Sequence, residues 1–119
     1  MKMNPRNPAT SLEHDPPVSG ELLNTGAATL KLLAEPTRLH LLWLLSGAEY
    51  SVNDLVAATG ISRTAVSQHL AKLRSGNLVQ TRKDGRRVIY RMDDGHLVRL
   101  VTEAVNHADH VISGEPRHE

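Results

Sequence analysis

The segment DDGHLVRLVTEAVNHADH near the C-terminus concentrates side chains that can bind a metal ion. It holds three of the seven histidines, His96, His107 and His110, and Asp94 adds a carboxylate. The apolar residues between them recur at helical spacing, so we expect a single helix from about Asp94 to Val111.

The spacing of these residues separates them into two half-sites. A helix rises about 1.5 Å and turns about 100° per residue, so the eleven-residue step from His96 to His107 makes about three turns. Both rings then lie on one face, but about 16 Å apart, and no single ion spans that distance. His107 and His110 are neighbours at a spacing of three. Asp94 and His96 can converge where Asp94 caps the start of the helix.

A second region that can do chemistry is the basic segment 62–91. It contains eight lysines and arginines and one acidic residue, Asp84, which gives it a charge of +7 on a chain of net charge +1. A local basic surface on a near-neutral chain is typical of nucleic-acid binding, and a solvated charged face is the alternative.

Two short helices are expected to position the first part of this basic segment. Ser51, with Asp54 three residues later, resembles a capping box, and the helix that follows ends at Gly60. Ser62 caps the next helix, RTAVSQHLAKLRS, which stops at Gly76. The residues of this helix that should be buried are Val66, Leu70 and Leu73. Two such helices joined by a tight turn form a helix-turn-helix.

A β-hairpin is expected directly after the second helix. The segment LVQTRKDGRRVIYRM is rich in strand-forming residues, which include Leu78 and Val79, and Asp84-Gly85 is a two-residue hairpin signal. A basic hairpin in this position is a wing. The fold class is therefore mainly α with a small β-hairpin, a winged helix-turn-helix.

The second helix of such a motif enters the major groove, and its first turns reach the base edges. Gln68 can pair with adenine, and Arg63 with guanine or phosphate, whereas the wing cations suit phosphates or the minor groove. For Gln68 and His69 the alternative is surface polarity and packing near the turn. The predicted DNA-contacting residues are Ser62, Arg63, Thr64, Ser67, Gln68, His69, Lys72, Arg82, Lys83, Arg86 and Arg87.

The remaining sequence indicates one small domain. We expect a disordered arm over residues 1–18, a folded domain over 19–112 and a flexible tail over 113–119. Ser19 should cap a first helix, and Pro36 should begin a second one. The residues of the second helix expected to face the core are Leu39, Leu42, Trp43 and Leu45.

The composition narrows the function further. The chain of 119 residues has no cysteine, which excludes disulfides and thiolate metal sites. It has no apolar run near the roughly 20 residues of a membrane span and no signal-peptide pattern at its start, so we expect a cytoplasmic protein without a membrane partner.

The segments AEPTRLHLLWLL, SVNDLVAATGISRTAVSQHLAKLRSGNLV and RKDGRRVIYRM resemble the ArsR/SmtB family of bacterial winged-helix repressors, over roughly residues 20–112. The resemblance implies a homodimer, joined through its N- and C-terminal helices, that blocks transcription at operator DNA and leaves it when an inducer binds. Many members of that family use a thiolate site. The absence of cysteine here argues against arsenic, cadmium or lead as the inducer.

Members of the family with a sensor site on the last helix show the D-x-H and H-x-x-H pattern that Asp94, His96, His107 and His110 match. Two copies packed antiparallel about a two-fold axis would bring the first pair of one subunit against the second pair of the other. Three imidazoles and a carboxylate suit tetrahedral zinc, whereas nickel and cobalt commonly take six N/O ligands. Extra donors for a larger shell exist in the arm and the tail: His14, His118 and Glu119.

The sequence therefore predicts a DNA-binding repressor that responds to Zn(II), or to Ni(II) or Co(II), and not an enzyme. One alternative is a winged-helix repressor that responds to a non-metal signal, in which the histidines are incidental. A zinc hydrolase would need an open coordination position and a motif such as H-E-x-x-H, which the sequence lacks. A storage role would leave the basic wing unexplained.

Overall fold

The computed structural model describes residues 17–114. The chain divides after Leu30 into two compact units. The second unit begins with the last turn of helix α1 (Gly20–Leu33) and contains all the later elements. The predicted arm lies almost wholly outside the described residues, as do most of the predicted tail and the candidate donors His14, His118 and Glu119.

Helix α1 begins where the sequence predicted it. The hydroxyl of Ser19 accepts a hydrogen bond from the amide of Leu22 at 3.1 Å, which satisfies one of the free amides of the first turn. Three leucines of the helix are largely exposed: Leu22, Leu23 and Leu30.

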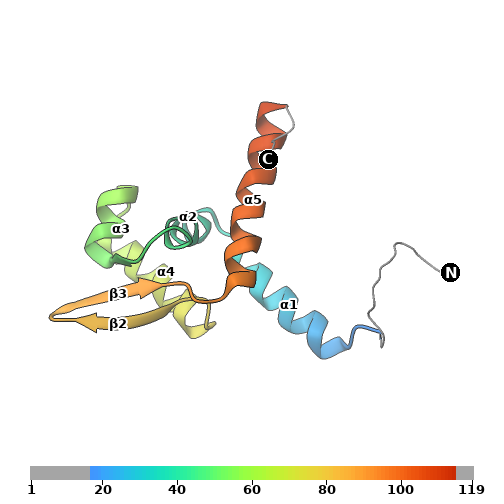
Figure 1. Ribbon diagram of the computed structural model, residues 1–119, viewed down its shortest axis with the longest axis horizontal. Coiled ribbons are helices and arrows are strands. Elements are labelled where there is room, and N and C mark those ends of the chain that lie inside the picture. Colours follow the sequence, from blue (N-terminus) through green and yellow to red (C-terminus); the bar gives the residue numbers. More distant parts are fainter. Residues whose placement is uncertain (1–16, 115–119) are drawn as a thin grey trace. The chain divides into compact units, whose positions relative to one another are not determined.

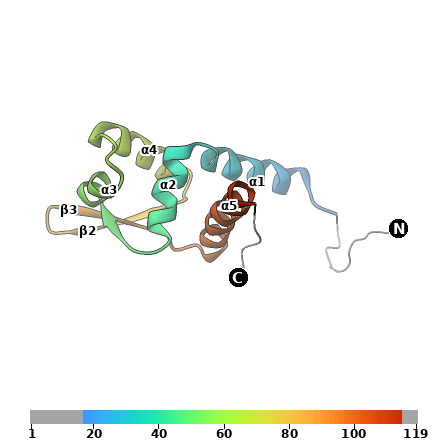
Figure 2. The same cartoon turned by 90° about the horizontal axis from the view of Figure 1, so that it is seen from above.

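Helix α2 (Pro36–Leu45) lies between α5 (Gly95–Ser113) on one side and the pair α3 (Val52–Thr59) and α4 (Arg63–Ser75) on the other (Figures 1 and 2). Glu35 caps α2 by accepting from the amide of Arg38 at 2.8 Å, and Pro36 occupies the first turn.

The buried face of α2 differs from the predicted one. Leu42 and Leu45 are buried as expected, and so is Leu41, but Trp43 is 39% exposed and the expectation for it was wrong. Most residues of the segment LHLLWLL are apolar, so its pattern does not fix which side of the helix faces inward. Packing against α4 and α5 decides the orientation, and it places Leu41 in the core.

Helices α3 and α4 form the predicted helix-turn-helix, with the predicted caps. Ser51 and Asp54 form a complete capping box, and Gly60 ends α3 in the left-handed conformation at φ 74°. Ser62 caps α4 by accepting from the amide of Ala65 at 3.1 Å. The predicted apolar stripe of α4, Val66, Leu70 and Leu73, is fully buried. After Gly76 the chain turns at Asn77, which takes a left-handed φ of 63°.

The hairpin of β2 (Gln80–Asp84) and β3 (Arg87–Arg91) confirms the predicted wing, with two differences. Leu78 and Val79 are buried in the core but precede the strand. Asp84 pairs with Arg87, so the loop residues are Gly85 and Arg86, one position later than the sequence signal. A two-residue strand that the sequence did not reveal, β1 (Tyr50–Ser51), pairs antiparallel with β3 and gives the sheet order β1-β3-β2.

Helix α5 is the longest helix of the described chain, and Figure 1 shows it on the opposite side of α2 from the hairpin. Asp94 caps it, and Gly114 ends it with a left-handed φ of 73°. Only its first half is anchored, because Leu97 and Val101 are buried in the same cluster as Leu70 and Leu73. Val111 and Ile112, near its end, are 63% and 85% exposed.

Candidate nucleic-acid interface and metal ligands

Helix α4 presents a polar surface opposite its buried leucines. The predicted contact residues on this surface that are exposed are Ser62, Arg63, Thr64, Ser67, Gln68 and Lys72. They start at the N-terminus of the helix, where unpaired backbone amides and the positive end of the helix dipole favour an approaching phosphate. The guanidinium of Arg63 donates to the side-chain oxygen of Asn53 on α3, which holds the first turn of α4 against the helix before it.

His69 is the predicted DNA contact that the structure places differently. Its ring is half-buried, with Nδ1 3.8 Å from the Glu35 carboxylate and 3.5 Å from the Arg38 guanidinium. Arg38 also donates to the carbonyl of Leu32 at 2.6 Å. These interactions tie α4 to the start of α2 and the end of α1, and they favour a packing role for His69 over a base contact.

The wing carries the four predicted cations, and two of them are paired. Arg82 donates to Glu49 at 2.9 Å and Arg87 to Asp54 at 3.1 Å, so these two pairs tie the strands to residues around β1. Within residues 17–114, neither Lys83 nor Arg86 forms an ion pair, and both are exposed at the end of the hairpin. They are the wing cations most available for a nucleic acid.

The contacts of Asp54 also change its pKa. Hydrogen bonds from the backbone and the hydroxyl of Ser51 lower the pKa of Asp54 below its usual value of 3.8, and the charge of Arg87 lowers it further. The same carboxylate thus caps α3 and joins it to the wing.

The first predicted half-site lies at the start of α5. Oδ1 of Asp94 accepts from the amides of His96 at 2.8 Å and Leu97 at 3.4 Å. Among the described residues, nothing hydrogen-bonds to Oδ2. Nδ1 of His96 lies 2.9 Å from the guanidinium of Arg99, one helical turn further on. A guanidinium only donates, so Nδ1 is the acceptor and the neutral ring carries its proton on Nε2.

The second predicted half-site lies in the last two turns of α5, where His107 and His110 are both exposed. Within residues 17–114 of one chain, no three histidine, aspartate or glutamate side chains come together as a metal site. The structure therefore places two donors at each end of α5 and does not unite the four.

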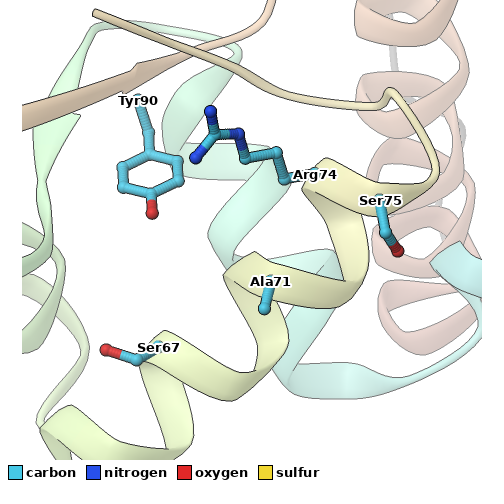
Figure 3. Close-up of a pocket in the computed structure, with 5 residues that line it drawn as sticks. All are labelled: Ser67, Ala71, Arg74, Ser75 and Tyr90. Carbon is cyan, nitrogen blue, oxygen red and sulfur yellow. The ribbon is translucent and has the colours of Figure 1, made fainter.

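One feature of the surface was not predicted. A pocket of about 430 Å³ lies between α4 and β3, lined by Ser67, Ala71, Arg74, Ser75 and Tyr90 (Figure 3). Three of the α4 residues recur at steps of four and three, which is a signal that the sequence does contain. The part played by Tyr90 depends on how the hairpin packs against the helix, and no local pattern reveals that.

Comparisons with known proteins identify the family to which this chain belongs. The model for the arsR family of bacterial regulatory proteins matches residues 35–81. The HTH-type transcriptional regulator KmtR of Mycobacterium tuberculosis is 47% identical over 88 residues, which are 74% of this chain and 68% of KmtR. The chain belongs to the ArsR family. The transcriptional repressor SmtB of the same organism is 36% identical over 92 residues, 77% of this chain and 68% of SmtB.

A solved structure agrees with the family and the fold. The homodimeric winged helix-turn-helix DNA-binding domain from Mycobacterium bovis matches 83% of this chain and 92% of its own, with a TM-score of 0.71 and 34% identity. The matched family and relatives are transcriptional regulators, which supports DNA binding and transcription regulation by this chain. Within residues 17–114, none of the helices combines the length and the apolar character needed to cross a bilayer.

Proposed function

We propose that this ArsR-family protein is a homodimeric repressor in the cytoplasm that leaves its operator when a divalent metal ion binds between the last helices of its two subunits. The proposed ion is Zn(II), with Ni(II) or Co(II) as the alternatives. The observation that carries the proposal is the arrangement on α5, where Asp94 and His96 stand at one end and His107 and His110 at the other, too far apart to meet within one chain.

The DNA-binding part of the proposal rests on α4 and the wing. Gln68 and its exposed neighbours on α4 are proposed to read bases, and Lys83 and Arg86 are proposed to reach the backbone or the minor groove at the hairpin end. Arg82 and Arg87 are each paired with a carboxylate in the free protein, so they are proposed to reach phosphates by exchanging those partners.

The dimer is supported by apolar surface that the single chain leaves in water. Monomeric proteins rarely keep several large apolar side chains exposed on two helices, and the Mycobacterium bovis neighbour is homodimeric. The side chains concerned on α1 and α5 are Leu22, Leu23, Leu30, Leu100, Val111 and Ile112. A two-fold axis would pair identical surfaces and create two equivalent metal sites.

The donor set fits a borderline metal ion. Asp94 keeps Oδ2 for a ligand while Oδ1 caps the helix, and His107 and His110 have exposed rings. His96 is available only when its bond to Arg99 is given up, because Nδ1 accepts from Arg99 while Nε2 carries the proton. A bound ion would supply a fixed bridge between the two subunits, and His14, His118 and Glu119 stay proposed as additional donors for nickel or cobalt.

The release of DNA is proposed to follow from the packing of α5. Leu97 and Val101 share one buried cluster with Leu70 and Leu73 of α4. A constraint on the paired last helices therefore favours one spacing of the two recognition helices, and successive major grooves accept only a spacing of about 34 Å.

The test is operator affinity by fluorescence anisotropy, with the metal-free protein and with zinc, nickel or cobalt. We expect at least one metal to weaken binding about tenfold or more, which lies within the usual range of roughly 5- to 150-fold for allosteric coupling. His107→Ala should remove the metal response and leave metal-free binding intact. His40→Ala, which changes an exposed histidine on α2, is the matched control. If the operator affinity is the same without metal and with each of the three metals, the protein is instead a regulator that responds to a non-metal signal.

A further inference from the structure

The pocket between α4 and the base of the wing lies where the DNA backbone has to pass, if the proposed function is right. Four of its lining residues, Ser67, Ala71, Arg74 and Ser75, come from the surface of α4, and Tyr90 comes from β3 (Figure 3). A recognition helix in the major groove and a wing tip in the adjoining minor groove are separated by one sugar-phosphate strand. That strand must run through the space between helix and hairpin.

Three of the four polar side chains in this pocket have no partner within the described part of the chain. Among residues 17–114, the Arg74 guanidinium, the Tyr90 hydroxyl and the Ser67 hydroxyl make no hydrogen bond or ion pair. Ser75 is different, because its hydroxyl donates to the carbonyl of Lys72 at 3.0 Å. Figure 3 shows Arg74 and Tyr90 at the same end of the pocket.

Arg74 also stands out among the arginines of the described chain. Six of the eight have a side-chain or carbonyl partner, and their partners are Leu32 and His69, Asn53, Glu49, Asp54, Asp93 and His96. The two without a partner are Arg74, in the pocket, and Arg86, at the wing tip. Arg74 therefore presents unneutralised charge in a pocket that it shares with Ser67, one of the predicted DNA-contacting residues, and Arg86 does so at the exposed wing tip.

The positions along the two elements fit one backbone strand. Gln68, the proposed base reader, precedes Arg74 by six residues, which is roughly 9 Å along a helix. Arg86 lies four residues before Tyr90, which is roughly 13 Å along a strand. The pocket is thus lined by the same two elements, α4 and the hairpin, that carry Gln68 and Arg86.

We propose that this pocket binds a phosphate of the DNA backbone, with Arg74 giving the charge-assisted contact and the hydroxyls of Tyr90 and Ser67 donating to the same phosphodiester. None of these interactions reads sequence. They set the depth and register of α4 in the groove, so that Gln68 meets the base edges.

The experiment measures binding of a fluorescein-labelled, mixed-sequence duplex across a series of chloride concentrations, with chelator present. Arg74→Gln should weaken binding and lower the slope of log K against log salt by about 0.9 for each phosphate that is no longer neutralised, or about 1.8 for a dimer. Arg74→Lys should keep most of the slope. Tyr90→Phe, which retains the ring, should weaken binding about three- to tenfold and leave the slope unchanged. The charge-matched control is Lys31→Gln, at the exposed end of α1.

Three results overturn parts of the reasoning separately. If Arg74→Gln changes affinity and slope no more than Lys31→Gln does, the pocket takes no phosphate, although the wild-type protein still binds DNA. If inorganic phosphate at matched ionic strength weakens DNA binding by the wild type and by Arg74→Gln equally, phosphate does not compete at Arg74, and the assignment of the pocket to a backbone phosphate fails. If the wild type shows no salt-dependent binding, the proposed function itself fails. Circular dichroism of each variant confirms that it is folded.

Discussion

Asp94 is predicted both to cap α5 and to bind a metal ion, and substitutions at this position can separate the two roles. Its Oδ1 accepts from two amides at the start of α5, one at 2.8 Å and one at 3.4 Å, so one good capping bond and one long one are at stake. Its carboxylate is also a proposed metal ligand. Asn caps a helix about as well as Asp, whereas Ala does not cap. Only Asp94→Asn therefore removes the anion and keeps the cap.

The expected magnitudes follow from these contacts. Asp94→Ala loses the capping bond, about 1 kcal/mol, and the favourable charge at the helix N-terminus, about 0.3–1 kcal/mol more. Asp94→Asn loses only the second part. For a domain of this size, 1 kcal/mol lowers Tm by about 4–8 °C. We expect Asp94→Ala to melt about 5–15 °C lower than the wild type, and Asp94→Asn no more than about 8 °C lower.

The two variants should behave alike toward metal. Because both lack the carboxylate, both should bind Zn(II) at least about tenfold more weakly, measured by competition with a chromophoric chelator. Thermal melts are recorded in excess chelator at one protein concentration, since dimers melt at concentration-dependent temperatures. If Asp94→Asn binds zinc as the wild type does, Asp94 is a cap alone. If it melts as low as Asp94→Ala, the capping argument is wrong.

Three further predictions concern other described contacts. Arg99→Ala should raise zinc affinity about three- to tenfold, because it frees Nδ1 of His96 and removes a nearby cation. If the zinc affinity measured by chelator competition is unchanged, the bond between Arg99 and His96 does not oppose metal binding. Gln68→Ala should cost about 1–3 kcal/mol at the operator and little on mixed-sequence DNA, and equal losses on both in anisotropy would deny it a reading role. The lowered pKa of Asp54 means that its contribution to stability is full above pH 3.8 and is lost as pH falls through the lower folded value. Asp54→Asn should therefore flatten the acid side of the Tm–pH curve below about pH 4, and parallel curves for variant and wild type would contradict this.

Much of the fold follows from local signals in the sequence. Ser51 with Asp54, Ser62, and the glycine at position 60 define the ends of α3 and α4 through short-range hydrogen bonds, so a local pattern is enough to place them. The stripe of α4 is equally clear because polar residues separate its apolar ones. These are the elements that hold Gln68 and the wing in place.

The rest depends on contacts between distant segments. Strand β1 is two residues long and exists because Tyr50 and Ser51 pair with Tyr90 and Ile89, about forty positions away in the chain. Trp43 is exposed because α4 and α5 select the other side of α2. The turn at Gly85 is displaced by one residue because the strand register, and not the Asp-Gly pair, sets the loop.

The candidate sites also differ in whether a local sequence pattern could reveal them. The two predicted half-sites could be recognised from the sequence because their residues all lie on or next to one helix, at helical spacing: Asp94, His96, His107 and His110. The bond between Arg99 and His96 was not predicted, although the two are three residues apart, because a cation is not itself a metal donor. The pocket beside Tyr90 needed the packed hairpin, and the union of the two half-sites needs a second chain.

The sharing of each ion between two chains is tested most directly by mixing two inactive variants. One carries Asp94→Ala and His96→Ala, and the other carries His107→Ala and His110→Ala, so neither homodimer holds a complete site. In a refolded equimolar mixture, half of the dimers are mixed, and each has one intact site and one empty site, so zinc binding should return to about a quarter of an ion per chain. No recovery on mixing, with both variants dimeric and folded, would contradict the shared site.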